Sequence, residues 1–251
     1  MLRQSIHDGI LTMRLDRGKA NALDRDLLER LAEALDGFAR DDALRAAVLT
    51  GTGSIFCAGV DLYRVLDGGA EYARAFVPVL AGTFHRLFAC PKPIVAAING
   101  HAIAGGCVLA AACDYRLMAS GDGTIGVPEL TVGVPFPLVA IEILRFATST
   151  AHLQDLVYRG TTYSTSAACE RGLVDEVVAP DELADRAVTV ARRLASEPAA
   201  RFRLTKQQLR APTIATIAAH AAETDAAVLA EWERPETVAA IRAYLDGRRR
   251  R

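Results

Sequence analysis

The sequence has no excess of charge of either sign, because 29 Lys and Arg residues are balanced by 30 Asp and Glu residues. Such a chain produces no overall field that would gather nucleic acid or an anionic membrane, so an anionic ligand must be held by local groups. Aromatic residues are also scarce, at 6% of the chain, and they are not interleaved with basic residues as they are where bases stack. We therefore expect neither a nucleic-acid partner nor a membrane partner.

The cysteines are few and show no metal-binding or disulfide pattern. They are odd in number and form no CxxC pair: Cys57, Cys90, Cys107, Cys113 and Cys169. This pattern argues against a disulfide framework and a zinc site, and it fits a reducing compartment. The first ten residues also lack the apolar stretch of a signal peptide, since Arg3, His7 and Asp8 interrupt them. We therefore predict a cytoplasmic location and no bound metal.

Nucleotide-binding fingerprints are absent as well. A GxGxxG motif starting at Gly51 would need a glycine where Phe56 stands, and no P-loop or GxSxG sequence occurs. The uncharged run Ile94–Cys113 is long enough to cross a bilayer. However, Asn99-Gly100-His101 and Gly105-Gly106 divide it into a predicted strand, a turn and a helix start. We expect no redox nucleotide cofactor and no transmembrane helix.

Predicted strands and helices alternate in the first half of the chain. Short apolar runs predict strands, and apolar residues at helical spacing predict the helices between them. The expected strands cover 6–15, 46–49 and 94–98, while the expected helices follow a cap at Asp24 and include Val77–Phe88. This alternation predicts an α/β domain with parallel strands and right-handed crossovers.

The pattern from position 137 onward is mostly helical. We expect one strand at Leu173–Val178, a helix that opens at Asp181 and a final Ala-rich helical segment, Pro212–Tyr244. The final segment carries large apolar residues, among them Ile217 and Trp232, that it cannot bury by itself. Docking on the core or on another subunit is therefore expected.

Two glycine-containing turns follow predicted strands, one at Gly59 and one at Gly105. Glycine lets the backbone approach a ligand closely, which would leave the N–H groups of Val60 and of Gly105 or Gly106 pointing outward. Two such donors could hold one oxyanion. The same glycines could instead only supply tight turns, and their spacing alone does not decide between these interpretations.

Five ordered segments resemble the signature segments of one enzyme superfamily. They are Asn21-Ala22-Leu23, Phe56–Leu62, Pro91–Gly100, Ala104–Cys107 and Cys113–Arg116. In this order they resemble the enoyl-CoA hydratase/isomerase (crotonase) superfamily, over about residues 6–210. The resemblance implies a crotonase-like spiral of ββα units in residues 1–195 and a helical C-terminal trimerisation region in residues 196–251. It further implies a homotrimer or a dimer of trimers.

The resemblance also implies an acyl-CoA thioester substrate, so that coenzyme A is part of the substrate and no separate cofactor is needed. The enolate oxygen would be held in an oxyanion hole by the backbone N–H groups of Val60 and Gly105. The substrate would be bound by Asn21, Ala22, Leu23, Val60, Asp61, Leu62, Tyr63 and Gly105. Asp61 follows the oxyanion turn and is more typical of a residue that caps or braces this turn than of a catalytic acid.

Hydratases of this superfamily carry two glutamates that face the substrate, and the sequence keeps one of them. The first position is occupied by Val108, which can neither activate water nor move a proton. The second is Glu129, whose apolar neighbours Val127, Pro128 and Leu130 would, if buried, raise its carboxyl pKa toward that of a general base. We therefore predict Glu129 as the catalytic base.

A single base is enough to move a double bond, because it can take a proton from C2 and return it at C4. Hydration needs a second group for the water, which Val108 does not provide. The segment Leu130–Leu138 also looks more like the apolar version found in some enoyl-CoA isomerases than like the glycine-rich version usual in hydratases. We favour an enoyl-CoA isomerase. The alternatives are a hydratase or another CoA-thioester lyase or hydrolase and, in another class, a non-catalytic scaffold or RNA-binding homologue.

Other polar residues are predicted to have ordinary roles. His85 lies on the edge of an apolar helical stripe, where some family members have a histidine near the thioester. It is therefore either a secondary site residue or a partly buried helix residue. Asp114 and Arg116 are interpreted as structural, and the arginines at 248–251 as a solvated end.

Overall fold

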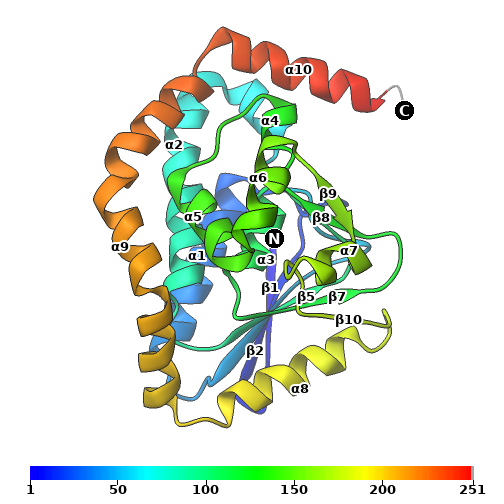
Figure 1. Ribbon diagram of the computed structural model, residues 1–251, viewed down its shortest axis with the longest axis vertical. Coiled ribbons are helices and arrows are strands. Elements are labelled where there is room, and N and C mark those ends of the chain that lie inside the picture. Colours follow the sequence, from blue (N-terminus) through cyan, green and yellow to red (C-terminus); the bar gives the residue numbers. More distant parts are fainter. Residues whose placement is uncertain (250–251) are drawn as a thin grey trace.

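Ten strands form two sheets in the computed structural model, which describes residues 1–249 (Figure 1). The larger sheet has the order β1 (Leu2–His7), β2 (Ile10–Leu15), β3 (Ala46–Gly51), β5 (Ile94–Ile98), β7 (Tyr115–Ala119) and β10 (Glu176–Val178). The smaller sheet has the order β4 (Ile55–Cys57), β6 (His101–Ile103), β8 (Thr124–Gly126) and β9 (Thr162–Ser164). All neighbouring strands are parallel except the β1–β2 and β8–β9 pairs. The predicted α/β fold is confirmed.

The chain visits the two sheets in turn, and a helix follows each visit. β3 and β4 lead into α2 (Leu62–Ala89), β5 and β6 into α3 (Gly105–Ala112), and β7 and β8 into α4 (Glu129–Val132). In each pair the first strand joins the larger sheet and the second joins the smaller one. This is the predicted spiral of ββα units. Because β4, β6 and β8 are parallel, the starts of α2, α3 and α4 gather at one edge of the smaller sheet.

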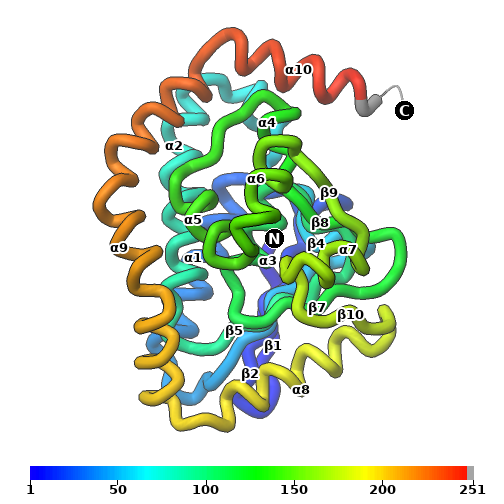
Figure 2. Tube along the Cα trace, in the orientation of Figure 1, coloured from blue at the N-terminus to red at the C-terminus, as the bar shows by residue number. Residues whose placement is uncertain are grey.

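The remaining helices cover this core. α1 (Arg25–Arg40) packs on α2, and α8 (Leu183–Ala195) packs on β3 and β5. The shorter helices are α5 (Leu138–Ala147), α6 (Thr150–Tyr158) and α7 (Thr165–Glu170). α9 (Ala199–Trp232) runs along the outside of α2 and α5, and α10 (Pro235–Arg249) then crosses one end of the molecule (Figures 1 and 2). No helix within residues 1–249 is both long and apolar enough to cross a membrane.

Two aspartates cap helix starts that frame the later site, and the cap at Asp24 was predicted. The Asp24 carboxylate accepts a hydrogen bond from the Leu27 backbone N–H at 3.0 Å and begins α1. The Asp61 carboxylate accepts one from the Arg64 backbone N–H at 3.2 Å and begins α2. Each carboxylate satisfies one of the backbone donors that a helix start leaves unpaired.

The predicted strand over 6–15 is wrong in one respect, because this segment is interrupted by a hairpin turn. Asp8 and Gly9 have φ angles of 51° and 75°, which a tight type I′ turn requires of its two central residues. The turn pairs β1 with β2 in an antiparallel register that places Leu2 opposite Leu15. An Asp-Gly pair between apolar residues is the sequence signal for this hairpin.

Four features of the second half of the chain differ from the prediction. The strand predicted over Leu173–Val178 forms only over its last three residues, as β10. β9 was not expected, because a three-residue strand gives almost no periodic signal. α8 begins after Glu182 without a side-chain cap, so Asp181 does not open it. Pro212 lies inside α9 rather than at the start of a helix, and the predicted segment Pro212–Tyr244 is divided where α9 ends at Trp232. The side chains of the predicted basic end, 248–251, lie outside the described residues.

α9 is anchored to the core by a buried cluster of charges. Lys206 and Arg210 project from α9, and their side chains contact the two carboxylate oxygens of Asp114 at 2.7 Å and 2.9 Å. Lys206 exposes only 6% of its surface and Arg210 only 4%. The Arg210 guanidinium also lies 4.2 Å from the centre of the Phe88 ring. Asp114 therefore joins the last long helix to the start of β7, in line with its predicted structural role.

Candidate active site

A largely apolar cavity of about 460 Å³ opens where the starts of α2, α3 and α4 gather. Its wall is assembled from distant parts of the chain, including the C-terminal helices. The lining residues are Arg17, Gly18, Lys19, Ala20, Ala22, Ala58, Val60, Asp61, Leu62, Tyr63, Leu80, Phe84, Ile103, Ala104, Gly105, Val108, Pro128, Glu129, Val132, Val134, Pro135, Phe136, Pro137, Ala140, Trp232, Tyr244 and Leu245.

The backbone N–H groups of Val60 and Gly105 are both unoccupied at this cavity. Leu23 pairs with Val60 as an isolated parallel bridge, in which Leu23 bonds Gly59 and Asp61 and leaves the Val60 N–H directed to the other side. Gly105 is the first residue of α3, where a helical N–H has no acceptor within the helix. Neither amide has an acceptor within residues 1–249. The two predicted oxyanion donors thus belong to the wall of one cavity.

The two backbone segments that carry these amides approach each other closely at Gly59 and Gly105. A Cβ atom on Gly59 would lie 3.1 Å from the Gly105 nitrogen and 2.6 Å from the Ala104 Cβ. A Cβ atom on Gly105 would lie 2.9 Å from a Leu23 methyl carbon. Ala104 itself has a φ of 55°, a conformation that costs a non-glycine residue about 1–3 kcal/mol. The glycines therefore permit a contact between two turns as well as the turns themselves.

Glu129 lies at the first position of α4, where it is buried in the cavity wall. It exposes 9% of its surface, and its Oε2 atom has no hydrogen-bond partner. Burial raises the pKa of Glu129 from 4.5 to about 8, and a hydrogen bond from its own backbone N–H opposes this shift only in part. The αL residue Gly133 ends the short helix, and a Cβ atom there would lie 2.6 Å from Ala240 of α10. The end of α4 is therefore packed closely against α10.

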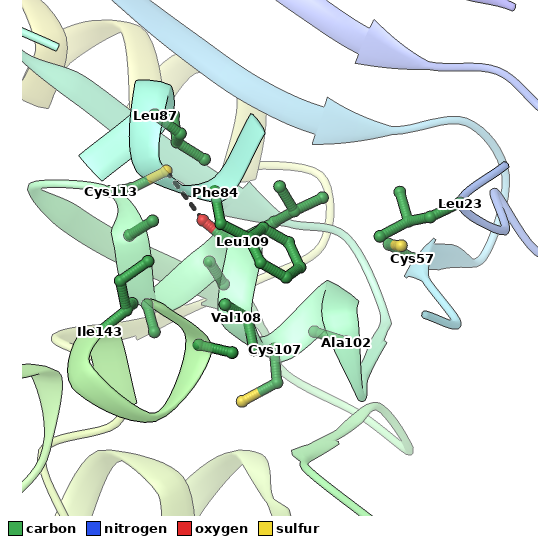
Figure 3. Packing of buried hydrophobic residues seen from close by; sticks show 14 of the residues in the cluster. Leu23, Cys57, Phe84, Leu87, Ala102, Cys107, Val108, Leu109, Cys113 and Ile143 are labelled. Carbon is green, nitrogen blue, oxygen red and sulfur yellow. Dashed lines mark hydrogen bonds between the residues drawn. The ribbon is translucent and has the colours of Figure 1, made fainter. Parts of the chain in front are cut away.

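Val108, which stands at the position predicted to lack a glutamate, lines the same cavity. Val108 is almost fully buried and lines the wall together with Phe84 of α2. Figure 3 shows both side chains within the packed core next to Cys107. Burial and, to a smaller extent, the charge of Glu129 raise the pKa of the Cys107 thiol, so this thiol is neutral and inert. The Val108 side chain therefore contributes only apolar surface to the cavity.

One edge of the cavity carries basic residues that the sequence analysis did not identify. Arg17 and Lys19 line it together with Ala20 and Ala22. Arg17 pairs with Asp24, whereas the exposed Lys19 has no acidic partner within residues 1–249. The two residues lie just outside the motif used for the resemblance, and a lone basic pair before Asn21 gives no signal of its own.

The structure divides the predicted substrate-binding residues into two groups. Ala22, Val60, Asp61, Leu62, Tyr63 and Gly105 line the cavity. Asn21 and Leu23 do not, because both are fully buried on the other side of the segment. The Asn21 amide donates to the backbone oxygens of Thr52 and Ile55, at 3.0 Å and 2.7 Å, and holds the turn together. Its side chain is therefore a structural element of the turn.

His85 lies away from this cavity. It faces a different cleft, between α2 and α9, whose wall includes Ile217 and Asp225. Burial is the main cause that lowers the pKa of His85, followed by the charge of Arg86. Of the two interpretations of His85, the structure therefore supports the partly buried helix residue.

The C-terminal helices contribute directly to the cavity. Trp232, at the end of α9, and Tyr244 and Leu245, in α10, are part of its wall. From its sequence, this region was expected to mediate oligomerisation and was not assigned to the site. A residue such as Trp232 carries no local signal for this role, because the contact depends on how α9 folds back over the core.

Known proteins resemble this chain in sequence and in fold. A sequence model of the family described as enoyl-CoA hydratase/isomerase matches residues 5–249. The chain is 36% identical, over 199 residues and 78% of each chain, to a putative enoyl-CoA hydratase from Thermus thermophilus. The solved structure of an enoyl-CoA hydratase from Mycobacterium marinum matches with a TM-score of 0.81 at 30% identity, covering 90% of this chain and 98% of that one.

The fold is also shared with a more distant protein of known structure. Human mitochondrial delta3-delta2-enoyl-CoA isomerase matches with a TM-score of 0.94 at 22% identity, covering 99% of this chain and 98% of that one. At this level of identity the similarity concerns the fold. By the family match and the curated relative, the chain belongs to the enoyl-CoA hydratase/isomerase family of the crotonase superfamily.

Proposed function

We propose that the protein is an enoyl-CoA isomerase that moves a double bond from the 3,4 to the 2,3 position of an acyl thioester. The observation that carries this proposal is a cavity whose wall holds one buried carboxyl, that of Glu129. Its Oε2 atom has no hydrogen-bond partner among residues 1–249. Asp61, the other acid in the wall, already caps α2. Val108 occupies the position that would hold a second acid.

The proposed reaction needs only groups that line this cavity. The Glu129 carboxylate takes a proton from C2, and the electron pair of the broken C–H bond moves toward the thioester carbonyl. The N–H groups of Val60 and Gly105 bind the resulting enolate oxygen, and each such bond is worth on the order of 3 kcal/mol of barrier. The protonated Glu129 then returns the proton at C4. A base with a pKa of about 8 suits both steps, because it accepts and releases a proton near neutral pH.

The basic edge of the cavity suits the coenzyme A portion. Arg17 and Lys19 place positive charge next to the segment that ends at Ala22. Phosphate groups of the coenzyme would be bound there, while the backbone donors hold the thioester. The proposal uses neither a metal nor a redox cofactor, so we expect chelators to leave the activity unchanged.

A direct test uses matched 2-enoyl-CoA and 3-enoyl-CoA thioesters with chromatographic analysis of the products. An isomerase interconverts the two thioesters without adding water. The names of the curated relatives favour a second candidate, a hydratase, which would instead form a 3-hydroxyacyl product. Absence of both products and of proton exchange at C2 would support a non-catalytic homologue.

A Val108→Glu variant should gain hydration of a 2-enoyl thioester that the unchanged protein lacks. The new carboxyl would enter the cavity beside Glu129, where it can orient and deprotonate a water molecule. The added 3-hydroxyacyl product is measured by chromatography. Val108→Gln, which adds similar volume without an ionisable group, is the control. Equal product from both variants would show that position 108 does not limit hydration.

The protein is expected to form a trimer or a dimer of trimers, and the structure changes the reason for this prediction. Ile217 and Trp232 are already buried within the chain, whereas Leu204 and Leu209 of α9 remain 57% and 64% exposed. Exposed apolar side chains on one helix favour contact with another subunit. Light scattering at micromolar concentration measures the mass, and a stable species of 26.8 kDa, the mass of one chain, would contradict the prediction.

A further inference from the structure

Trp232 carries a buried N–H group that has no hydrogen-bond partner. Among the residues described, three buried side-chain atoms lack a partner, namely Thr52 Oγ1, Glu129 Oε2 and Trp232 Nε1. Two of these residues, Glu129 and Trp232, line the same cavity. Buried polar groups in proteins are normally paired, because leaving one unpaired is costly. The Nε1 atom is closed to solvent in the unliganded chain, so a ligand completes its pairing by seating against the indole and opening this part of the wall.

The indole is held in position by its surroundings. Trp232 exposes only 4% of its surface and is the last residue of α9. The next residue, Glu233, accepts a hydrogen bond from the Arg74 side chain of α2 at 2.6 Å, which fixes the end of the helix. An indole N–H can only donate, so its partner must be an acceptor such as oxygen.

Much of the cavity is lined by side chains that offer no such acceptor. Its wall includes the apolar residues Leu80, Phe84, Val132, Val134, Phe136, Ala140 and Leu245. A plain hydrocarbon chain would satisfy these surfaces and leave the Trp232 N–H unpaired. A site built to bond a polar substrate group discriminates strongly against the analogue that lacks it, because the buried partner is then left alone.

We propose that Trp232 is a specificity-determining residue that donates a hydrogen bond to an oxygen atom on the acyl chain of the substrate. The preferred substrates would then be acyl-CoA thioesters whose chain carries a keto or hydroxyl oxygen beyond the reacting carbons. This inference rests on the proposed function, since it places an acyl-CoA thioester in the cavity.

The first test compares the full-length protein with a Trp232→Phe variant, which keeps an aromatic ring but has no N–H. Each protein is assayed with plain 3-enoyl-CoA thioesters and with thioesters of equal length that carry a keto group at successive carbons. We expect one keto position to be preferred by the unchanged protein. The ratio of kcat/KM for that keto thioester to kcat/KM for the plain one should fall about tenfold in the variant.

The second test does not depend on catalysis, because the chain contains a single tryptophan. Labelling the indole with ¹⁵N gives one N–H signal, and saturated acyl-CoA thioesters occupy the cavity without reacting. The keto thioester should move this signal downfield relative to the plain thioester, as a new hydrogen bond does. Binding of both thioesters with no turnover of any enoyl thioester would refute the proposed isomerase and leave the role of Trp232 intact.

A Val228→Ala variant separates hydrogen bonding from packing. Val228 lies one turn before Trp232 and is buried, but it is not part of the cavity wall. The Val228→Ala substitution should weaken the packing of α9 and change kcat/KM for both substrates by a similar factor. Two results would overturn the proposal: an equal change of kcat/KM for both substrates in Trp232→Phe, or an indole signal that is the same with every thioester. Either would mean that the indole serves packing or bonds an internal water.

Discussion

Replacing Glu129 with Gln is expected to lower the turnover of a 3-enoyl thioester by a factor on the order of 10²–10⁴, the usual contribution of a positioned general base. The amide keeps the shape of the side chain but cannot accept the C2 proton. The oxyanion donors and the basic edge belong to other residues, Val60, Gly105 and Arg17, so binding should change little. Exchange of the C2 proton with deuterated solvent measures the loss, and binding of a saturated acyl-CoA is the control.

The pH dependence of activity and of stability gives an independent check on Glu129. Since its pKa in the folded chain is about 8, kcat/KM of the unchanged protein should rise with pH up to about that value. Between pH 4.5 and about 8, Glu129 is protonated in the folded chain and ionised in the unfolded chain. Its contribution to the free energy of unfolding therefore decreases as the pH rises through this range. The Gln variant has no ionisable group at this position, so its stability lacks this pH dependence. It should therefore gain roughly 4 kcal/mol of stability relative to the unchanged protein by pH 8.

These measurements also define how the assignment of Glu129 could fail. A Gln variant that exchanges the C2 proton at the original rate would mean that another group is the base. His85 is not a substitute, because it faces a different cleft. Asp61 would then be the remaining carboxyl in the cavity wall, and it would be the next residue to replace.

Replacing Asp114 with Asn should destabilise the folded chain by about 3–5 kcal/mol, the usual result of removing one partner of a buried ion pair. Lys206 and Arg210 would both keep their charge in a buried environment without the carboxylate that compensates it. Burial is the main cause that lowers the pKa of each of these groups, and the charge of Asp114 opposes it. Denaturant unfolding at a fixed protein concentration measures the change.

A matched control is available in the pair between Arg25 and Glu29. Its two charged groups are 2.6 Å apart, as close as those of the buried cluster, but both side chains are about half exposed. Glu29→Gln should therefore cost no more than about 0.5 kcal/mol. Similar losses for Glu29→Gln and Asp114→Asn would mean that burial of the Asp114 cluster adds nothing to its contribution.

The sequence was sufficient for features that are encoded locally. The cap at Asp24 and the apolar runs of β3 and β5 lie within a few residues of their own signals, so they were predicted closely. Glu129 was found because it belongs to a motif with a second, substituted position, Val108. Its unpaired oxygen and raised pKa follow from burial by other segments, which no window of sequence contains.

What the sequence did not predict depends on contacts between distant segments. Lys19 comes to the cavity through the loop before α1, and Trp232 comes to it through the end of α9. The short β9 exists because β8 offers it a partner strand rather than because of its own three residues. In each case the information lies in the packing of elements that are far apart in the chain, and not in local periodicity.

α9 joins the charge cluster near one end to the cavity at the other, so a displacement at the cluster would be carried along the helix to the cavity. Lys206 and Trp232 are 26 positions apart on this helix, which at 1.5 Å per residue corresponds to about 39 Å. A tilt of only about 3° at the cluster would move the indole by about 2 Å over that length. Substitutions near the cluster, far from any bound thioester, can thereby alter the depth of the cavity and the length of chain it accepts.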